Sequence, residues 1–158
     1  MNKKVIAFIC VHNSCRSQIA EALGRYLLSD KFSCYSAGTV LKDKINQDAV
    51  RLIKELYGID MEKHGQKSKL IKDIPTPDLA ISMGCDVSCP FIGRPFDDNW
   101  HLEDPTGKSD EIFKRVIKEI EEKNYAEPFT KIAKITDIYA YGIAFCKKDC
   151  TVACKKIK

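Results

Sequence analysis

The sequence predicts an α/β domain built on a parallel β-sheet, and two patterns lead to this prediction. Short apolar runs alternate with amphipathic segments of helical period through residues 1–124, which is the pattern of strands joined by crossover helices. The chain has 158 residues, of which 44% are hydrophobic, and this is enough for one domain with a complete core. Because each crossover returns the chain to the same end of the sheet, the strands should be parallel and flanked by helices on both faces.

Two strand–helix pairs are predicted in the first part of the chain. Residues 5–10 form a continuous apolar run typical of a buried strand, and residues 16–29 have the apolar period of a helix. Residues 32–36 should form the second strand. Residues 46–57 are again helical by their apolar period, and Gly58 provides a helix stop.

The remaining elements are shorter. Residues 68–73 predict a helical turn, residues 79–83 a third strand, and residues 96–100 a short fourth strand. A last helix should begin at a cap formed by Ser109 and continue to Glu122.

The loop after the first strand carries a specific motif, a cysteine followed by five residues and an arginine. Cys10 ends the predicted strand and Arg16 opens the predicted helix, so backbone N–H groups converge at a helix N-terminus, where the dipole adds positive charge. Such a loop can bind an oxyanion, and the Arg16 guanidinium can contact two of its oxygens. We expect the oxyanion-binding residues to be Val11, His12, Asn13, Ser14, Cys15, Arg16 and Ser17.

Cys10 is the predicted nucleophile of this loop. The field that binds an anion also stabilises a thiolate, and a thiolate beside a tetrahedral oxyanion can attack phosphorus or arsenic. Asn13 should brace the loop, and Ser17 should donate its hydroxyl to Cys10. Cys15 is interpreted as a packing residue. The alternative for Cys10 is a buried structural thiol, which leaves Arg16 without a role.

These motifs resemble those of the low-molecular-weight protein tyrosine phosphatase superfamily, and within it the thioredoxin-coupled arsenate reductases. The resemblance covers residues 3–123, and its stretches are CVHNSCRSQIAE at 10–21, SAG at 36–38, MGCDVSCP at 83–90 and WHLEDPTG at 100–107. It implies a three-layer, phosphotyrosine-phosphatase I-like fold with four strands in the order 2-1-3-4. The Cys10 loop then lies where the winding of the sheet reverses, which is the usual ligand position in such folds.

The resemblance also implies a general acid. Asp104 matches the acid of the family's Asp-Pro element, and a displaced oxygen leaves readily only when it is protonated. His12 stands where the family more often has glycine. Histidine tolerates a positive φ better than most residues, so we expect the loop to keep its shape with a different rim. His12 is the alternative candidate for the acid.

Cys85 and Cys89 favour reduction over hydrolysis. Hydrolysis of a phosphate ester needs one cysteine, whereas reduction of arsenate needs two electrons from thiols. The resemblance implies that Cys10 attacks arsenate and that Cys85 displaces arsenite, leaving a disulfide between them. Cys89 then moves this disulfide outward, where thioredoxin reduces it. The spacing of four residues suits one face of a helical turn. A zinc pair is the alternative, with His64 or His101 as further ligands.

Two other functions stay open. The first is a phosphatase that hydrolyses aryl phosphates through a cysteinyl-phosphate on Cys10. It is disfavoured because Thr106-Gly107 follows the Asp-Pro element, where the phosphatase branch usually has a tyrosine nearby, and because Gln18 replaces that branch's proline. The second is a thiol-based protein that binds or senses arsenite or a metal ion through its C-terminal cysteines.

Residues 125–158 lie beyond the resemblance, so we expect them to form an extension to a domain of residues 1–124. Cys146, Cys150 and Cys154 recur every four residues, which predicts that they share one face of a helix. Besides binding arsenite or a soft metal ion, such a segment could contact a partner or a membrane surface, or simply pack.

Charge and composition narrow the function further. The net charge of +4 lies in the extension, since residues 1–124 carry 19 basic and 19 acidic side chains and residues 125–158 carry 7 and 3. A neutral domain argues against nucleic-acid binding. No apolar run is long enough for a transmembrane helix, so no stable membrane association is expected.

Free thiols predict a reducing compartment, the cytoplasm. The expected partners are arsenate and thioredoxin, and no cofactor or metal ion is expected.

Overall fold

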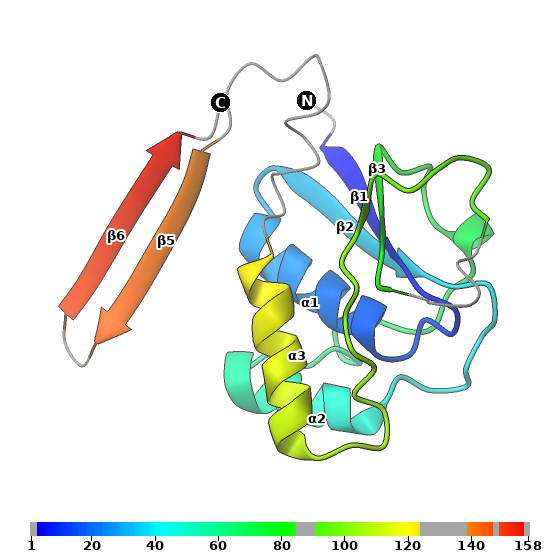
Figure 1. The fold of residues 1–158 in the computed structure, drawn as a ribbon, viewed down its shortest axis with the longest axis horizontal. Coiled ribbons are helices and arrows are strands. Elements are labelled where there is room, and N and C mark those ends of the chain that lie inside the picture. The colour runs from blue at the N-terminus through cyan, green and yellow to red at the C-terminus, as the bar shows by residue number, and fades with distance from the viewer. Residues whose placement is uncertain (1–2, 85–90, 124–138, 147–148, 157–158) are drawn as a thin grey trace. The chain divides into compact units, whose positions relative to one another are not determined.

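The computed structural model describes residues 3–84, 91–123, 139–146 and 149–156. The chain divides into two compact units, Met1–Lys123 and Asn124–Lys158. In chain order the elements are β1 (Lys4–Ile9), α1 (Arg16–Leu28), β2 (Phe32–Ala37), α2 (Gln47–Tyr57), the 3-10 helix η1 (Ile71–Asp73), β3 (Leu79–Ser82), β4 (Asp98–Asn99), α3 (Asp110–Glu122), β5 (Tyr139–Cys146) and β6 (Asp149–Lys156) (Figure 1).

The first unit is built on a four-stranded parallel sheet in the order β2-β1-β3-β4, which confirms the predicted fold and strand order. The central strand β1 pairs with β2 from Lys4 opposite Phe32 to Ile9 opposite Ala37, and its second half pairs with β3. The chain therefore winds outward from β1 in both directions. The carboxyl end of β1 is the point of reversal, and it leads directly into the Cys10 loop.

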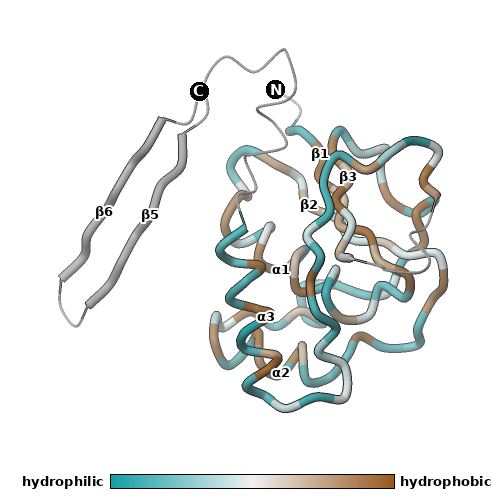
Figure 2. The backbone as a smooth tube through the Cα atoms, in the orientation of Figure 1, coloured by the Kyte–Doolittle hydropathy of each residue, from teal (hydrophilic) through white to brown (hydrophobic). Residues whose placement is uncertain are grey.

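The two faces of the sheet are covered differently. Helix α1 packs on β1 and β2, and α2 and α3 contact α1 (Figure 1). Phe8 faces this layer, because a Cβ added to Gly24 of α1 would lie 3.2 Å from its ring. Ala7, Ile9 and Ala37 form a cluster on the opposite face. Partly buried residues of η1 and of the segment before β4 cover that cluster: Ile71, Ile74, Ile92 and Phe96. Figure 2 shows the apolar stretches of β1 and β3 between these two layers.

Helix α2 has a polar cap at each end. The Oδ1 atom of Asn46 accepts hydrogen bonds from the backbone N–H groups of Asp48 and Ala49, at 3.0 and 3.1 Å, and these are donors that a helix start leaves unpaired. Gly58 ends the helix with a φ of 70°, as predicted, and its N–H donates to Lys54 at 3.0 Å. Caps at both residues fix where α2 begins and ends.

Helix α3 starts at the predicted place without the predicted cap. Ser109 occupies the N-cap position, but its side chain makes no capping bond. It instead helps to lower the pKa of the nearby Glu111 carboxyl group. The first turn of α3 is held to α2 by an ion pair of 2.6 Å between Arg51 and Asp110. No helix in the described parts of the chain is long and apolar enough to span a membrane.

The second unit contains an antiparallel hairpin of β5 and β6, so the prediction that Cys146, Cys150 and Cys154 share a helical face is wrong. The register sets Cys146 opposite Asp149, Cys150 opposite Phe145 and Cys154 opposite Tyr141. A repeat of four residues is also a multiple of the two-residue period of a strand, so it does not distinguish the two structures. The aromatic and β-branched residues of the segment favour the strand.

Candidate active site

The Cys10 loop connects the end of β1 to the start of α1 and is held by backbone contacts on its outer side. The carbonyl of Val11 accepts hydrogen bonds from the N–H groups of Thr39 and Val40, at 2.9 and 3.0 Å. The carbonyl of His12 accepts from the Ser68 hydroxyl at 3.1 Å, and that of Ser14 from the Asn46 N–H at 2.7 Å. Because these carbonyls bond outward, they leave the centre of the loop to N–H groups.

Gly38 allows the loop to lie close to the end of β2. A Cβ added to Gly38 would approach the carbonyl oxygen of Val11 to 2.5 Å and the backbone nitrogen of Asn13 to 3.0 Å. Backbone atoms cannot move aside as a flexible side chain can, so any larger residue here displaces the loop. The Ser-Ala-Gly stretch is therefore tied to the loop by close packing.

The unusual backbone angle of the loop lies at Asn13, not at His12. Asn13 has a φ of 47°, and the only other described non-glycine residue with a positive φ is His101. His12 has no positive φ, so its tolerance of that angle is not used in this loop. Asparagine is among the residues that adopt this conformation most readily, since its short polar side chain can bond locally. The His12 side chain is exposed, and its carbonyl points to Ser68.

Cys10 receives two hydrogen-bond contacts at its sulfur. The backbone N–H of Asn13 donates to Cys10 Sγ at 3.0 Å, and the Oγ atom of Ser17 lies 2.9 Å from the same sulfur. The Nδ2 atom of Asn13 donates to Ser17 Oγ at 3.0 Å. Cys10 is 6% exposed, and Asn13 and Ser17 are fully buried. The Cys10 sulfur is therefore a buried atom with two polar hydrogen-bond contacts.

Arg16 is anchored at the mouth of the loop. Its Nη1 atom donates to the carbonyls of Met83, Gly84 and Leu102, at 3.3, 3.0 and 2.7 Å. Its Nη2 atom lies 3.7 Å from Asp104 Oδ2. The Arg16 side chain is 14% exposed, and the three carbonyls hold its guanidinium in place. This orientation suits the two-pronged contact that a guanidinium makes with an oxyanion.

Asp104 lies beside Arg16, in a more open position. Its side chain is 57% exposed. Partial burial opposes ionisation, but hydrogen bonds from Thr106 and the charges of Arg16 and Lys108 outweigh it and lower the pKa of Asp104. The backbone N–H of Thr106 donates to Asp104 Oδ1 at 3.1 Å. Without a ligand, Asp104 is therefore a carboxylate at neutral pH.

Cys15 lies in the loop and is buried, with 5% of its surface exposed. Burial is the largest effect on this thiol and raises its pKa to about 12. Cys15 is therefore a neutral thiol at neutral pH, and it is poorly suited to act as a nucleophile.

Two glutamines that the sequence analysis did not assign to the site support the loop. Gln18 Nε2 donates to Asn13 Oδ1 at 2.9 Å and to Lys67 O at 2.9 Å, and Gln66 Nε2 donates to Gln18 Oε1 at 2.9 Å. The only sequence signal was that Gln18 stands in place of a proline. Gln66 gave no signal, because it lies 48 residues from its partner.

Cys85 and Cys89 fall in residues 85–90, outside the described residues. The last described residue before this segment is Gly84, whose carbonyl accepts a hydrogen bond from Arg16. The zinc alternative involves these two cysteines and so also lies outside the described residues. In the described parts of the chain, no group of three His, Cys, Asp or Glu side chains could hold a metal ion. His101 follows β4 with a φ of 47° and lies against Gly84, where a Cβ would approach its Cα to 2.7 Å.

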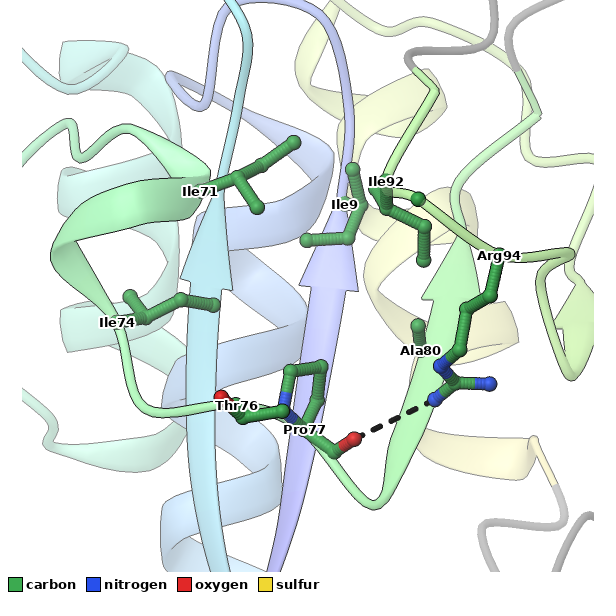
Figure 3. A pocket seen from close by; sticks show the side chains of 9 residues that line it. Ile9, Ile71, Ile74, Thr76, Pro77, Ala80, Ile92 and Arg94 are labelled. Carbon is green, nitrogen blue, oxygen red and sulfur yellow. Dashed lines mark hydrogen bonds between the residues drawn. The ribbon is translucent and has the colours of Figure 1, made fainter.

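A separate apolar pocket of about 180 Å³ lies on the face of the sheet that η1 covers (Figure 3). Ile9 of β1 and Ala80 of β3 form its floor, and Arg94 closes one side by donating to the carbonyl of Pro77 at 3.4 Å. Of the site residues that the structure describes, none lines this pocket. The residues predicted to bind the oxyanion lie instead in the loop between β1 and α1.

Comparisons with known proteins identify the family of the chain. The model of the low molecular weight phosphotyrosine protein phosphatase family matches residues 5–134. Arsenate reductase 1 of Staphylococcus epidermidis is 38% identical over 125 residues, which are 76% of this chain and 92% of that protein.

Two solved structures have the same fold. One is an arsenate reductase in a phosphate-binding state, 34% identical with a TM-score of 0.65, in an alignment that covers 84% of this chain and 99% of that one. The other is a thioredoxin-dependent arsenate reductase of Corynebacterium glutamicum, 30% identical with a TM-score of 0.57, covering 76% of this chain and 59% of that one. The chain belongs to the low molecular weight phosphotyrosine protein phosphatase family, among its arsenate reductases.

Proposed function

We propose that this protein reduces arsenate to arsenite and that Cys10 is the nucleophile. The observation that carries the proposal is the pair of contacts at the Cys10 sulfur, from the Asn13 N–H at 3.0 Å and the Ser17 hydroxyl at 2.9 Å. Arg16 follows in the chain at the start of α1, where its guanidinium lies 3.7 Å from Asp104. This arrangement stabilises a thiolate next to the place where a tetrahedral oxyanion binds. The relatives called arsenate reductases support the choice of arsenate.

The first step joins sulfur to arsenic. The Cys10 thiolate attacks arsenate and forms a sulfur–arsenic bond, and an arsenic-bound hydroxyl group leaves as water after it has taken up one proton. Asp104 supplies that proton. An oxyanion bound at Arg16 places negative charge beside the Asp104 carboxylate and weakens the effect of the guanidinium, and both changes favour the protonated acid.

Two further thiols complete the reduction. Cys85 attacks the sulfur of Cys10, the electron pair of the sulfur–arsenic bond moves to arsenic, and arsenite departs. Two thiols are oxidised to one disulfide, while arsenic gains two electrons. Cys89 then attacks Cys85 and forms the outer disulfide, with Cys10 returning to its thiolate. We propose thioredoxin as the reductant of this disulfide, as the name of the Corynebacterium glutamicum protein suggests.

The catalytic residues proposed here lie between Cys10 and Asp104, so we assign the reaction to a domain of residues 1–124 and treat residues 125–158 as an extension. This sequence of thiol–disulfide steps through Cys10, Cys85 and Cys89, called the relay below, needs reduced thiols at the start of each turnover. We therefore propose that the protein works in the reducing cytoplasm.

The test separates reduction from phosphate-ester hydrolysis, which could use the same Cys10, Arg16 and Asp104. The purified protein is given arsenate with thioredoxin, thioredoxin reductase and NADPH, and arsenite is measured. A parallel assay follows hydrolysis of an aryl phosphate without a reductant. Sustained formation of arsenite that depends on thioredoxin supports the proposal. Aryl-phosphate hydrolysis with no arsenite would assign the site to a phosphatase.

Arg16→Lys should reduce turnover of arsenate by about a hundredfold or more. A lysine keeps one positive charge but loses both the two-pronged contact with the anion and the fixed plane that the carbonyls of Met83, Gly84 and Leu102 impose. The measurements are kcat/KM for arsenate and the dissociation constant of phosphate, an inert analogue. Arg51→Lys is the matched control, because Arg51 also bonds a carboxylate but lies on α2. Normal phosphate affinity in Arg16→Lys would refute the described role.

Asp104→Asn should slow formation of the sulfur–arsenic adduct by about a hundredfold at neutral pH, which is the usual contribution of a positioned acid. Asparagine has a similar shape and cannot donate the proton, so binding of the anion should persist. Single-turnover kinetics with the variant measure the first step directly, and Asp110→Asn serves as a control on the surface of α3. An unchanged rate would move the acid role to another group, and His12→Gln would then be tested.

A further inference from the structure

We propose that Gln18 and Gln66 are positioning residues that fix the direction of a chain of hydrogen bonds ending at Cys10. The chain runs from Gln66 to Gln18, then to Asn13, Ser17 and the sulfur. Its links measure 2.9, 2.9, 3.0 and 2.9 Å. The inference rests on the proposed function, because it explains how the nucleophile of that reaction is kept as a thiolate.

Backbone groups determine which way each amide is turned. The backbone N–H of Lys69 lies 2.8 Å from one end of the Asn13 amide. An N–H can only donate, so this end is the acceptor Oδ1. The donor Nδ2 must therefore be the atom that faces Ser17. The orientation of Asn13 follows from a neighbour whose own hydrogen-bond role is fixed.

The same argument orients both glutamines. One end of the Gln18 amide faces the carbonyls of Asn13 and Lys67, at 3.1 and 2.9 Å, and carbonyls only accept, so this end is Nε2. The other end is then Oε1 and needs a donor, which Gln66 Nε2 supplies. Gln66 Nε2 also donates to the carbonyl of Gln18 at 3.1 Å. Every amide in the chain therefore donates in the direction of Cys10.

The direction of these hydrogen bonds determines where Ser17 can donate, because its hydroxyl has one proton. Its oxygen accepts from Asn13 Nδ2, and among the described contacts Cys10 Sγ is the acceptor within reach of its proton. Since the Asn13 N–H also donates to this sulfur, we take the sulfur as the acceptor in the Ser17 contact. A sulfur that accepts from both Ser17 and the Asn13 N–H is favoured as a thiolate. Hydrogen bonds that point the same way polarise one another, so links distant from the sulfur still strengthen the last one.

Burial makes this arrangement effective. Asn13, Ser17 and Gln18 have no exposed surface, and Gln66 is 5% exposed. Water therefore does not compete for these donors, and a hydrogen bond is electrostatically stronger in such surroundings. A role in packing alone would be met by a side chain of similar volume without an amide. Methionine is such a side chain, and this difference makes the proposal testable.

The experiment measures alkylation of Cys10 by iodoacetamide as a function of pH, with mass spectrometry of the Cys10 peptide to separate it from the other cysteines. The variants are Gln18→Met and Gln66→Met. Gln47→Met is the matched control. Gln47 is the remaining glutamine of the chain, and its side chain also donates to a backbone carbonyl and to another side chain, but away from the loop. Circular dichroism and thermal unfolding establish that each variant is folded.

We expect Gln18→Met to lower the rate of Cys10 alkylation at about pH 6 by about tenfold and to move the pH profile upward by about one unit. Gln66→Met should lower the rate by about threefold, because it removes only the outermost link. All variants should reach the wild-type rate at high pH, where the thiolate forms without help. Gln47→Met should follow the wild-type profile.

The outcomes separate this inference from the proposed function. A wild-type Cys10 that reacts no faster at about pH 6 than an ordinary thiol would refute Cys10 as the activated nucleophile. A reactive wild-type Cys10 with unchanged profiles in both folded variants would refute the chain of hydrogen bonds and leave the proposed function standing. If Gln18→Met does not fold, Gln66→Met decides the question, since it leaves every bond within the loop in place.

Discussion

Cys10→Ser should abolish reduction of arsenate and any hydrolysis of aryl phosphates. A serine hydroxyl stays protonated in this site, so the donors from Ser17 and the Asn13 N–H meet a neutral oxygen and no nucleophile forms. Loss of a covalent nucleophile normally stops its step almost completely, and the residual rate should be below about one per cent of the wild type. The measurement is arsenite formed per minute with the complete thioredoxin system, and aryl-phosphate hydrolysis without it.

Cys34→Ser is the matched control for this substitution. Cys34 is 3% exposed in β2, and burial raises the pKa of its thiol to about 12, so it is another buried cysteine of the same domain. The control should keep turnover, with at most a lower stability from the buried hydroxyl. If Cys10→Ser retained more than about one per cent of the activity while binding phosphate normally, another thiol would be the nucleophile.

The fold could be predicted because its pattern is local. Each buried strand is a short apolar run, and each helix has a clear apolar period, so β1, α1 and α2 were found to within a few residues. The order of the strands came from the family resemblance. The hairpin of β5 and β6 was missed, because a spacing of four residues suits a strand as well as a helix.

The site could be predicted only in part. Cys10 and Arg16 are separated by a spacing that the chemistry itself requires, so the loop was visible in the sequence. The positive φ at Asn13 was not visible in the sequence. Asn13 is contacted by residues distant in the chain, since Gly38 packs closely against its backbone and the Lys69 N–H donates to its side chain. The link from Gln66 to Gln18 spans 48 residues and exists only once the chain is folded.

The relay makes a different prediction for each of the two remaining cysteines. Arsenate must gain two electrons, and Cys10 alone cannot form a disulfide, so a second thiol has to act before arsenite can leave. A third thiol acts only afterwards, when the disulfide is passed outward. The order in which the thiols act therefore determines how much arsenite each variant can release.

Cys89→Ser should release about one arsenite per chain and then stop, because the first two chemical steps need only Cys10 and Cys85. The variant should be trapped as the Cys10–Cys85 disulfide. Thioredoxin should reduce this disulfide poorly, since Cys10 is only 6% exposed within its loop and exchange requires access to sulfur. Cys85→Ser should stop earlier, with less arsenite than one per chain, and any aryl-phosphate hydrolysis should survive both substitutions.

Single-turnover release of arsenite, with mass-spectrometric mapping of the disulfide, measures each outcome. Sustained turnover by Cys89→Ser with thioredoxin would remove Cys89 from the relay and direct the search to Cys146, Cys150 and Cys154.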